Sequence, residues 1–367
     1  MLLLNGLATV FAVILHSVYW VLTAMIWWTD RYQPEAVVPN FDRVGGPGYY
    51  VLFLIEPLVA MGVPAFLFIS GYFVATTTGE QGRTLTWKIV VARIVNLVPP
   101  YLIWSTAAVS LQIIDGQRYS VLSLLWKLLN GGVTAPYYYV PVLIQFYLLS
   151  PFITQLARRH WKWVLAVTGL IQLVQVLLHN FFLVDPDVFG STATWVRIII
   201  NWHLIGLAFW FALGMVVGFH VSKFKQHLAL LKRPLVIALP LLLTLALIEG
   251  EALRQLSGRY WISGTANLFS GLFALTALLS FFAFDNTPIP YTARLSQIGA
   301  KSYGIYLIHV LVLEVTARMV YHVVPGLLAY QILFQPLLIV AGLGIPLVIM
   351  EIVKRSPIRR YYAYMFG

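Results

Sequence analysis

A histidine near the middle of the first apolar stretch, His16, is the residue best placed to do chemistry. An ionisable side chain at bilayer depth is costly and usually serves a function. Asn5 precedes it by 11 residues, so on a helix the two side chains project from nearly the same face, roughly 16 Å apart along the axis. A neutral imidazole there could act as a general base. The alternative is a structural histidine that bonds a neighbouring helix.

A second group of polar side chains comes late in the chain, in the stretch SYGIYLIHVLVL. Ser302, Tyr306 and His309 follow i, i+4 and i+7 spacing and therefore share one helix face. If this helix runs outward, His309 lies at a membrane depth comparable to that of His16. A face that carries serine, tyrosine and histidine favours a polar cavity over lipid.

Two features of the second apolar stretch also stand out. Ser70 and Gly71 interrupt the aromatic run FLFISGYF, and a glycine there lets a ligand or another backbone approach closely. The alternative is a contact between helices through small residues. Glu56, beside Pro57, is either paired with a cation or exposed to an aqueous cavity.

The stretch KIVVARIVNLVPPY begins with Lys88 and carries a cation, Arg93, one turn inside a basic loop. Pro99 and Pro100 follow and break or kink the helix. A cation at a kinked helix entrance is well placed to bind phosphate. An arginine that snorkels to the membrane surface gives the same sequence pattern, so both interpretations stay open.

The elements that must position these residues are membrane-spanning helices. Hydrophobic residues make up 60% of the 367 and charged residues 10%, whereas a soluble domain has about 25% charged residues. A span needs about 20 apolar residues. On that criterion we expect an all-α polytopic membrane protein of ten spans: residues 2–28, 49–74, 92–112, 137–157, 163–182, 196–219, 234–250, 261–284, 298–317 and 329–353.

The basic residues give the orientation of these spans. With the N-terminus inside, 16 of the 24 Lys and Arg residues fall on the cytoplasmic side, which predicts that both termini are cytoplasmic. This bias explains the net charge of +11 without nucleic-acid binding. No linker or repeat divides the chain, so residues 1–367 are expected to form a single domain. The first stretch is too long for a signal core and no Lys or Arg precedes Arg31, so it should remain as a helix.

Composition also excludes some chemistry. The chain has no cysteine, which removes disulfides, thiolate metal sites and a cysteine-borne acyl intermediate. We find no metal-ligand cluster and no glycine-rich phosphate loop in the sequence, and we expect no metal cofactor.

Together, the four stretches resemble the integral-membrane acyltransferase 3 family. Its members are typically ten-helix proteins that transfer acyl groups from acyl-coenzyme A to hydroxyls of cell-surface sugars, lipids or small molecules. The spacing in NGLATVFAVILH matches the family's first-helix motif of an arginine, ten residues and a histidine. FLFISGYF, ARIVNLVPPY and SYGIYLIH are similar to three later motifs in the same order. The resemblance covers essentially the whole chain.

The chain departs from the family pattern at three places. Asn5 stands where the family has the arginine, Asn96 where many members have a second arginine after Arg93, and Pro64 where an acidic residue is common. By resemblance, the residues that contact coenzyme A would be Asn5, Ser70, Gly71, Lys88, Arg93 and Asn96. The missing cations leave open how the donor is held, and Arg83, Lys88 or Arg93 could supply the charge instead.

The resemblance implies O-acyl transfer of an acetyl or succinyl group from acyl-CoA, with acetyl-CoA as the expected donor, to a hydroxyl of a cell-envelope glycan or glycolipid. His16 would be the general base, and Glu56, Gln145, Ser302, Tyr306 and His309 would bind the acceptor or orient His16. The expected location is the inner (cytoplasmic) membrane, with self-association or contact with glycan-assembly proteins left open. The alternative is a transporter or flippase with His16 and Glu56 in its pathway, which Pro-interrupted spans would suit.

Overall fold

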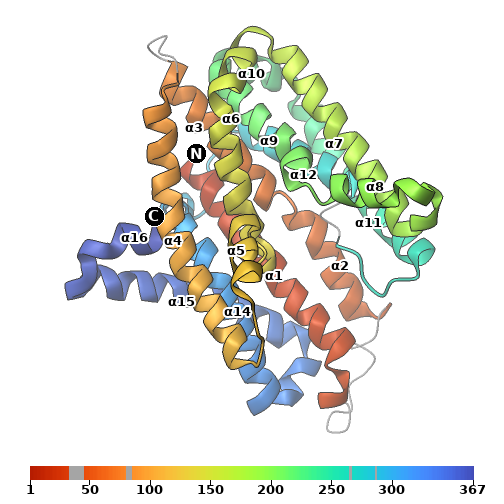
Figure 1. Ribbon diagram of the computed structural model, residues 1–367. Helices are drawn as coiled ribbons and strands as arrows, with labels where there is room; N and C mark the ends of the chain where they lie inside the picture. The colour runs from red at the N-terminus through yellow and green to blue at the C-terminus, as the bar shows by residue number, and fades with distance from the viewer. Residues whose placement is uncertain (33–44, 80–84, 264–266, 286) are drawn as a thin grey trace.

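The computed structural model describes residues 1–32, 45–79, 85–263, 267–285 and 287–367 (Figure 1). Regular structure in these residues consists of α-helices and short 3-10 helices, without a strand. The all-α prediction is therefore confirmed. The α-helices are α1 (Leu2–Trp27), α2 (Pro47–Val59), α3 (Gly62–Gly79), α4 (Trp87–Ile114), α5 (Val121–Asn130), α6 (Tyr139–Arg159), α7 (Trp161–Val184), α8 (Ala193–Ile200), α9 (His203–Phe219), α10 (Val221–Leu230), α11 (Lys232–Ser257), α12 (Leu268–Ala283), α13 (Thr292–Ala300), α14 (Ser302–Val323), α15 (Gln331–Arg355) and α16 (Tyr362–Phe366).

In the described part of the chain, five 3-10 helices connect or end these elements: η1 (Thr29–Arg31), η2 (Ala135–Tyr138), η3 (Pro186–Thr192), η5 (Pro325–Ala329) and η6 (Pro357–Tyr361). One of them, η2, precedes α6 directly and is the connection that reaches the site described below.

Each of the ten predicted apolar segments contains a described helix, but not every segment is one straight helix. In the described residues, 8 helices are long and apolar enough to cross a membrane, and there are 9 candidates if η3–α8 and α9, bent by 43°, are counted as one broken span. Of the segment predicted over 261–284, residues 264–266 lie outside the described residues, and the described part is helical in α12, over 16 residues. Such a helix rises about 24 Å, less than the hydrocarbon thickness of about 30 Å. The protein is a polytopic membrane protein.

The second span is broken in the middle. Pro57 lies inside α2, the helix ends at Val59, and α3 begins at Gly62. A Cβ atom on Gly62 would lie 3.4 Å from the carbonyl oxygen of Ala8 and 3.5 Å from the backbone nitrogen of Ala12. The break therefore brings the start of α3 against α1, one turn before His16.

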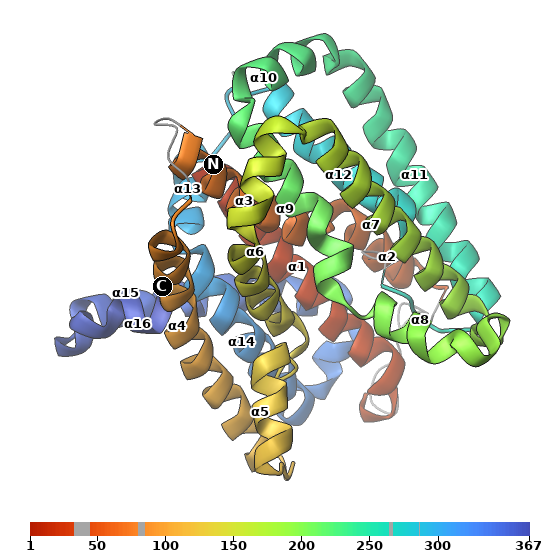
Figure 2. The same ribbon diagram turned by 45° about the horizontal axis from the view of Figure 1, so that its top comes forward.

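Helix α1 is central to the bundle and contacts α2, α3, α13, α14 and α15. Helices α7, α8 and α11 extend to one side, and α15 with α16 to the other, in both views (Figures 1 and 2). Helices α7 and α11 are mostly unburied, because only 6% of the apolar stretch of α7 and 17% of that of α11 are buried inside the protein. Such exposure suits helices that face lipid.

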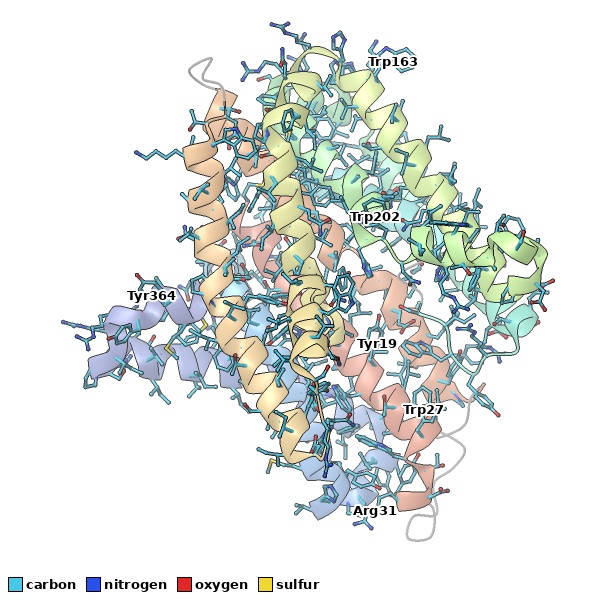
Figure 3. All side chains as sticks on the ribbon, viewed as in Figure 1. Tyr19, Trp27, Arg31, Trp163, Trp202 and Tyr364 are labelled. Atoms are coloured by element: carbon cyan, nitrogen blue, oxygen red, sulfur yellow. The ribbon has the colours of Figure 1, made fainter. Side chains whose placement is uncertain are left out.

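Charge distinguishes the two ends of the bundle. Trp163 lies at one end, and Trp27 and Arg31 lie at the other (Figure 3). The end near Trp163, here called the basic end, carries basic residues at the α6–α7 turn, on α10 and at the start of α11: Arg158, Arg159, Lys162, Lys225, Lys232 and Arg233. By the positive-inside rule, the basic end is the predicted cytoplasmic side.

Candidate functional site

The two mid-helix histidines meet. Nδ1 of His16 on α1 lies 2.8 Å from Nε2 of His309 on α14. The rings stack with centroids 5.1 Å apart and planes inclined by 29°. His309 is fully buried, with 0% exposure, whereas His16 is only half-buried. The two histidines, which the sequence predicts at similar depth, are thus in direct side-chain contact.

The hydrogen bonds around this pair define which ring nitrogens carry protons when both rings are neutral. Nδ1 of His309 lies 3.0 Å from the carbonyl oxygen of Ile305. A carbonyl can only accept, so His309 Nδ1 donates and its Nε2 is the acceptor. His16 Nδ1 must then donate to His309, and the lone pair of His16 is left on Nε2. That nitrogen has the electronic form that a general base needs.

His16 lies on the wall of a cavity of about 610 Å³ between α1, α3, α7, α9, α12 and η2. Within the described part of the chain, the ring of His16 makes no hydrogen bond other than the one to His309. Tyr19, one turn further along α1, lines the same cavity and lies edge-on to the His16 ring, with centroids 5.9 Å apart. The free nitrogen of His16 is therefore on the side of the ring that a ligand could reach.

Tyrosines tie η2 to α14 beside the histidine pair. The hydroxyl of Tyr306 donates to the carbonyl of Pro136, and the hydroxyl of Tyr137 donates to the carbonyl of Leu307 over 2.6 Å. Pro136 and Tyr138 line the cavity. Tyr306 thus fixes a piece of cavity wall, and its own hydroxyl is occupied by that bond.

Asn5 and Ser302 also meet, in what is here called the closed contact, because it lies beside a tight helix crossing and neither residue lines the cavity of His16. The amide nitrogen of Asn5 donates to Ser302 Oγ over 2.7 Å and to the carbonyl of Gly299 over 2.8 Å. Next to this contact, α1 and α13 cross closely, because a Cβ on Gly299 would lie 2.0 Å from the carbonyl oxygen of Leu2. Donor binding by Asn5 stays a prediction, and the structure gives its amide nitrogen a structural partner.

Gly71 lies where α3 crosses α9. A Cβ there would lie 2.1 Å from the carbonyl oxygen of Phe211, and a Cβ on Gly214 would lie 1.9 Å from the carbonyl oxygen of Phe68. Ser70 donates to the carbonyl of Phe66 over 2.9 Å. This geometry matches the small-residue helix contact that the sequence left open.

Glu56 is fully buried, at 0% exposure, and accepts a hydrogen bond from Trp261 Nε1 over 3.0 Å. Trp261 packs on Tyr19 with ring centroids 5.1 Å apart, and Ser263 lies 3.0 Å from the Tyr19 hydroxyl. Glu56 therefore helps hold the segment after α11 against α1. Gln145 is half-buried on α6, and neither it nor Glu56 is on the wall of the cavity.

Of the cations considered for donor binding, Arg83 lies outside the described residues, and Lys88 and Arg93 lie at the basic end. Arg93 donates to Thr77 Oγ1 over 2.8 Å and to the carbonyl of Phe73 over 3.0 Å. Lys88 and Asn96 are exposed. Neither they nor Arg93 are within the 610 Å³ cavity that holds His16.

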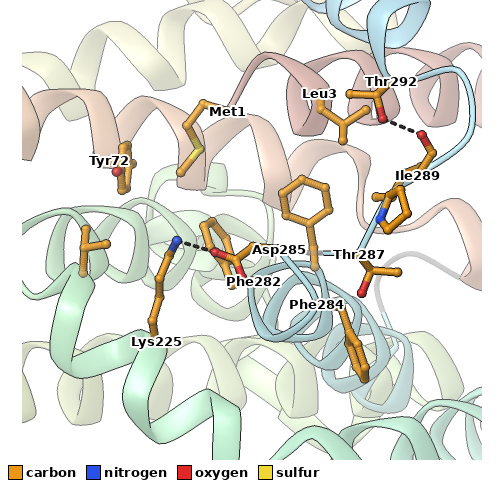
Figure 4. A pocket seen from close by; sticks show the side chains of 13 residues that line it. Met1, Leu3, Tyr72, Lys225, Phe282, Phe284, Asp285, Thr287, Ile289 and Thr292 are labelled. Atoms are coloured by element: carbon orange, nitrogen blue, oxygen red, sulfur yellow. Dashed lines mark hydrogen bonds and ion pairs between the residues drawn. The ribbon is translucent and has the colours of Figure 1, made fainter.

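A second cavity, of about 530 Å³, lies at the basic end (Figure 4). Its wall includes Met1, Tyr72 and the ion pair between Lys225 and Asp285. Tyr72 is adjacent in α3 to Phe73, whose carbonyl holds Arg93, so this cavity and Arg93 share one end of one helix.

Several polar residues of the larger cavity were missed by the sequence analysis. They are Gln172, Gln175 and His179 on α7, Asn201 and His203 at the α8–α9 bend, and Asn267 and Ser270 at the start of α12. The spacing of Gln172, Gln175 and His179 on one face of an otherwise apolar span was a usable signal. Asn267 and Ser270 offered none, because the predicted span ran through them.

The fold and the site together define a class: a multi-pass membrane protein with a buried histidine pair, one ring of which faces a cavity. The chain matches the family model for an acyltransferase domain, Acyl_transf_3, over residues 3–351. It therefore belongs to the acyltransferase 3 family, and its activity is acyl transfer. No curated protein and no solved structure matches the chain.

Proposed function

We propose that this protein is an acyl-CoA-dependent O-acyltransferase of the inner membrane that modifies a hydroxyl of a cell-envelope glycan or glycolipid, with His16 as the general base. One observation carries the proposal. His309 occupies one nitrogen of His16 and leaves the other, unprotonated nitrogen beside a cavity large enough for a substrate. Family membership supports acyl transfer as the reaction.

The reaction follows from that protonation state. His16 Nε2 accepts the proton of the acceptor hydroxyl as the oxygen bonds to the acyl carbonyl carbon. The thioester C–S bond then breaks, and the imidazolium returns the proton to the departing thiolate. His309 stabilises the positive charge on His16 by accepting from its Nδ1 throughout. General acid–base catalysis of this kind contributes about 10²–10⁴-fold to a rate.

The donor is proposed to enter from the basic end. Coenzyme A carries several negative charges, and Arg93, Lys88 and Lys225 lie at this end. Arginine binds phosphate well because its guanidinium presents several donors in one plane. Acetyl-CoA is the proposed donor, and its narrow pantetheine arm would bring the thioester to the depth of His16.

The proposal is tested by following transfer from radiolabelled acetyl-CoA to envelope glycans and lipids in membranes with His16→Ala. We expect transfer to fall by about 10²–10⁴-fold, the share that a general base supplies. His227→Ala is the matched control, because His227 is exposed on α10 at the basic end. Full transfer in a correctly inserted His16→Ala protein would contradict the proposal.

A further inference from the structure

The 610 Å³ cavity beside His16 has an uncharged wall. It is here called the neutral cavity, because the described residues that line it include no Lys, Arg, Asp or Glu. Its polar side chains are amides, hydroxyls and imidazoles, set among apolar residues such as Leu173, Leu207 and Leu272. A charged ligand group would lose its hydration here without meeting an opposite charge, which is costly.

Three polar groups on this wall have no partner within the described residues. They are Oε1 of Gln172, Nδ2 of Asn267 and Oγ of Ser270, each buried from solvent. Asn267 is 2% exposed and Ser270 is 1% exposed. Buried polar groups in proteins are almost always hydrogen-bonded, so three unpaired groups on residues of one wall favour an occupant whose donors and acceptors these side chains meet when they turn toward the cavity.

The case of Asn267 is specific, because it stands at the N-cap of α12. An asparagine there usually accepts a hydrogen bond from the first turn of the helix. Here the carboxylate of Glu249 on α11 does so instead, accepting from the backbone N–H of Leu268 over 2.9 Å and of Phe269 over 2.8 Å. The side chain of Asn267 makes no capping bond, its amide nitrogen has no partner among the described residues, and the residue lies on the cavity wall.

Aromatic side chains complete the wall. The rings of Tyr138 and His203 stack with centroids 4.2 Å apart, and both residues line the cavity together with Tyr19 and Trp210. Pockets with apolar and aromatic walls and a few placed polar groups are typical of small-molecule sites. A sugar ring, which has apolar C–H faces and hydroxyl edges, fits both kinds of surface.

We infer that the neutral cavity is the acceptor site and that it selects an uncharged, hydroxyl-rich group, such as a neutral sugar or polyol, over an anionic one. The inference rests on the proposed function, which places the acceptor hydroxyl at His16. It assigns Gln172, Asn267 and Ser270 as specificity residues. The phosphates of the donor are excluded from this cavity and belong at the basic end with Arg93.

The test uses two photoreactive probes on the purified full-length chain: a diazirine-bearing alkyl β-glucoside and the matching alkyl β-glucuronide. The neutral probe should label peptides of α7 and α12 saturably, and the anionic probe should label them at least about tenfold less, because its carboxylate has no counter-ion there. Equal saturable labelling by both probes would overturn the inference.

Gly271 provides a variant that fills the cavity. It lines the wall, and a Cβ there would have no atom within 4 Å, so Gly271→Leu adds volume into open space. Gly344 on α15 is the matched control, since its Cβ would also meet nothing within 4 Å and it lies outside the cavity. Labelling by the neutral probe should be lost in Gly271→Leu and kept in Gly344→Leu.

Two further variants separate the possible failures. If Gly271→Leu does not fold, the double variant Gln172→Ala/Ser270→Ala decides, because it adds no volume and should reduce neutral-probe labelling. Unchanged labelling in a folded cavity variant overturns the inference. Labelling needs no reaction, so His16→Ala should still be labelled. If the His16→Ala protein were labelled and also kept full acyl transfer, the proposed role of His16 would be wrong, while the neutral cavity would still be a site for neutral ligands.

Discussion

Helix α1 makes two polar contacts with the region of α13 and α14, and their surroundings differ. Towards the basic end, Asn5 bonds Ser302 and Gly299 at a place where the backbones of α1 and α13 nearly touch. Eleven residues further along α1, His16 bonds His309 beside a cavity of about 610 Å³.

The difference lies in what each side chain has left to offer. The side-chain amide nitrogen of Asn5 donates both of its hydrogen bonds to protein groups, where α1 crosses α13. His16 uses one nitrogen for His309 and keeps the other beside the cavity. A polar residue in a membrane helix is costly in either place, but only the second can exchange a proton with a ligand. The predictions below test this contrast.

Among the variants that compare these two contacts, replacing His309 should have the largest effect. His309→Phe removes the acceptor that holds the proton on His16 Nδ1, so His16 loses both its orientation and its fixed tautomer. We expect kcat to fall by about 10–100-fold, by analogy with metal sites, where this is the usual loss when the hydrogen-bond partner that orients a metal-binding histidine is removed. The KM for the acceptor should stay nearly unchanged, because His309 does not line the cavity.

His309→Gln is the matched variant, because its amide oxygen can accept from His16 Nδ1. It should recover part of the lost kcat in the same steady-state assay. A purely packing role for His309 predicts the opposite order, with Phe tolerated and Gln not.

Disturbing the closed contact should affect stability more than catalysis. In Gly299→Ala the added Cβ would lie 2.0 Å from the carbonyl oxygen of Leu2 and 2.7 Å from the backbone nitrogen of Gly6, so α1 and α13 must separate. Overpacking of this kind costs about 1–3 kcal/mol. We expect a lower free energy of unfolding, measured by denaturation in detergent micelles, with kcat per folded molecule close to that of the wild type.

Gly344→Ala is the control for this substitution. Its Cβ meets open space, and alanine is the better helix former by about 1 kcal/mol, so this variant should be neutral or slightly more stable. A Gly299→Ala protein of full stability but strongly reduced kcat would show that the closed contact takes part in the reaction.

The sequence was sufficient to locate the long apolar helices and to place the two histidines at the same level of the bundle. The apolar runs predicted every span that the structure contains, and the spacing within each helix put His16 and His309 at similar depth. It could not show that they touch, because spacing along a helix does not define which neighbouring helix a face meets. The same limit hid the pairing of Asn5 with Ser302.

The sequence pattern did not define the role of Gly71 or the start of α12, and tertiary contacts define both. Pattern alone gave Gly71 two interpretations, and only the carbonyl of Phe211 at 2.1 Å from its Cβ position identifies a helix crossing. The segment before α12 is apolar enough to be read as helix, yet Glu249 caps α12 at Leu268 and so defines its start. Asn267 became visible as a site residue only once that cap was known.

The smallest expected effect concerns the bond between Asn5 and Ser302 itself. A double-mutant cycle with Asn5→Ala and Ser302→Ala should give a coupling free energy of about 0.6 kcal/mol, the average for hydrogen bonds between membrane helices. The readout is the free energy of unfolding, and the KM for acetyl-CoA should not change in either variant. A severalfold rise of that KM in Asn5→Ala alone would instead assign Asn5 to donor binding, as its position in the family motif predicts. The two contacts of α1 would then be two parts of one substrate path, rather than one structural and one catalytic contact.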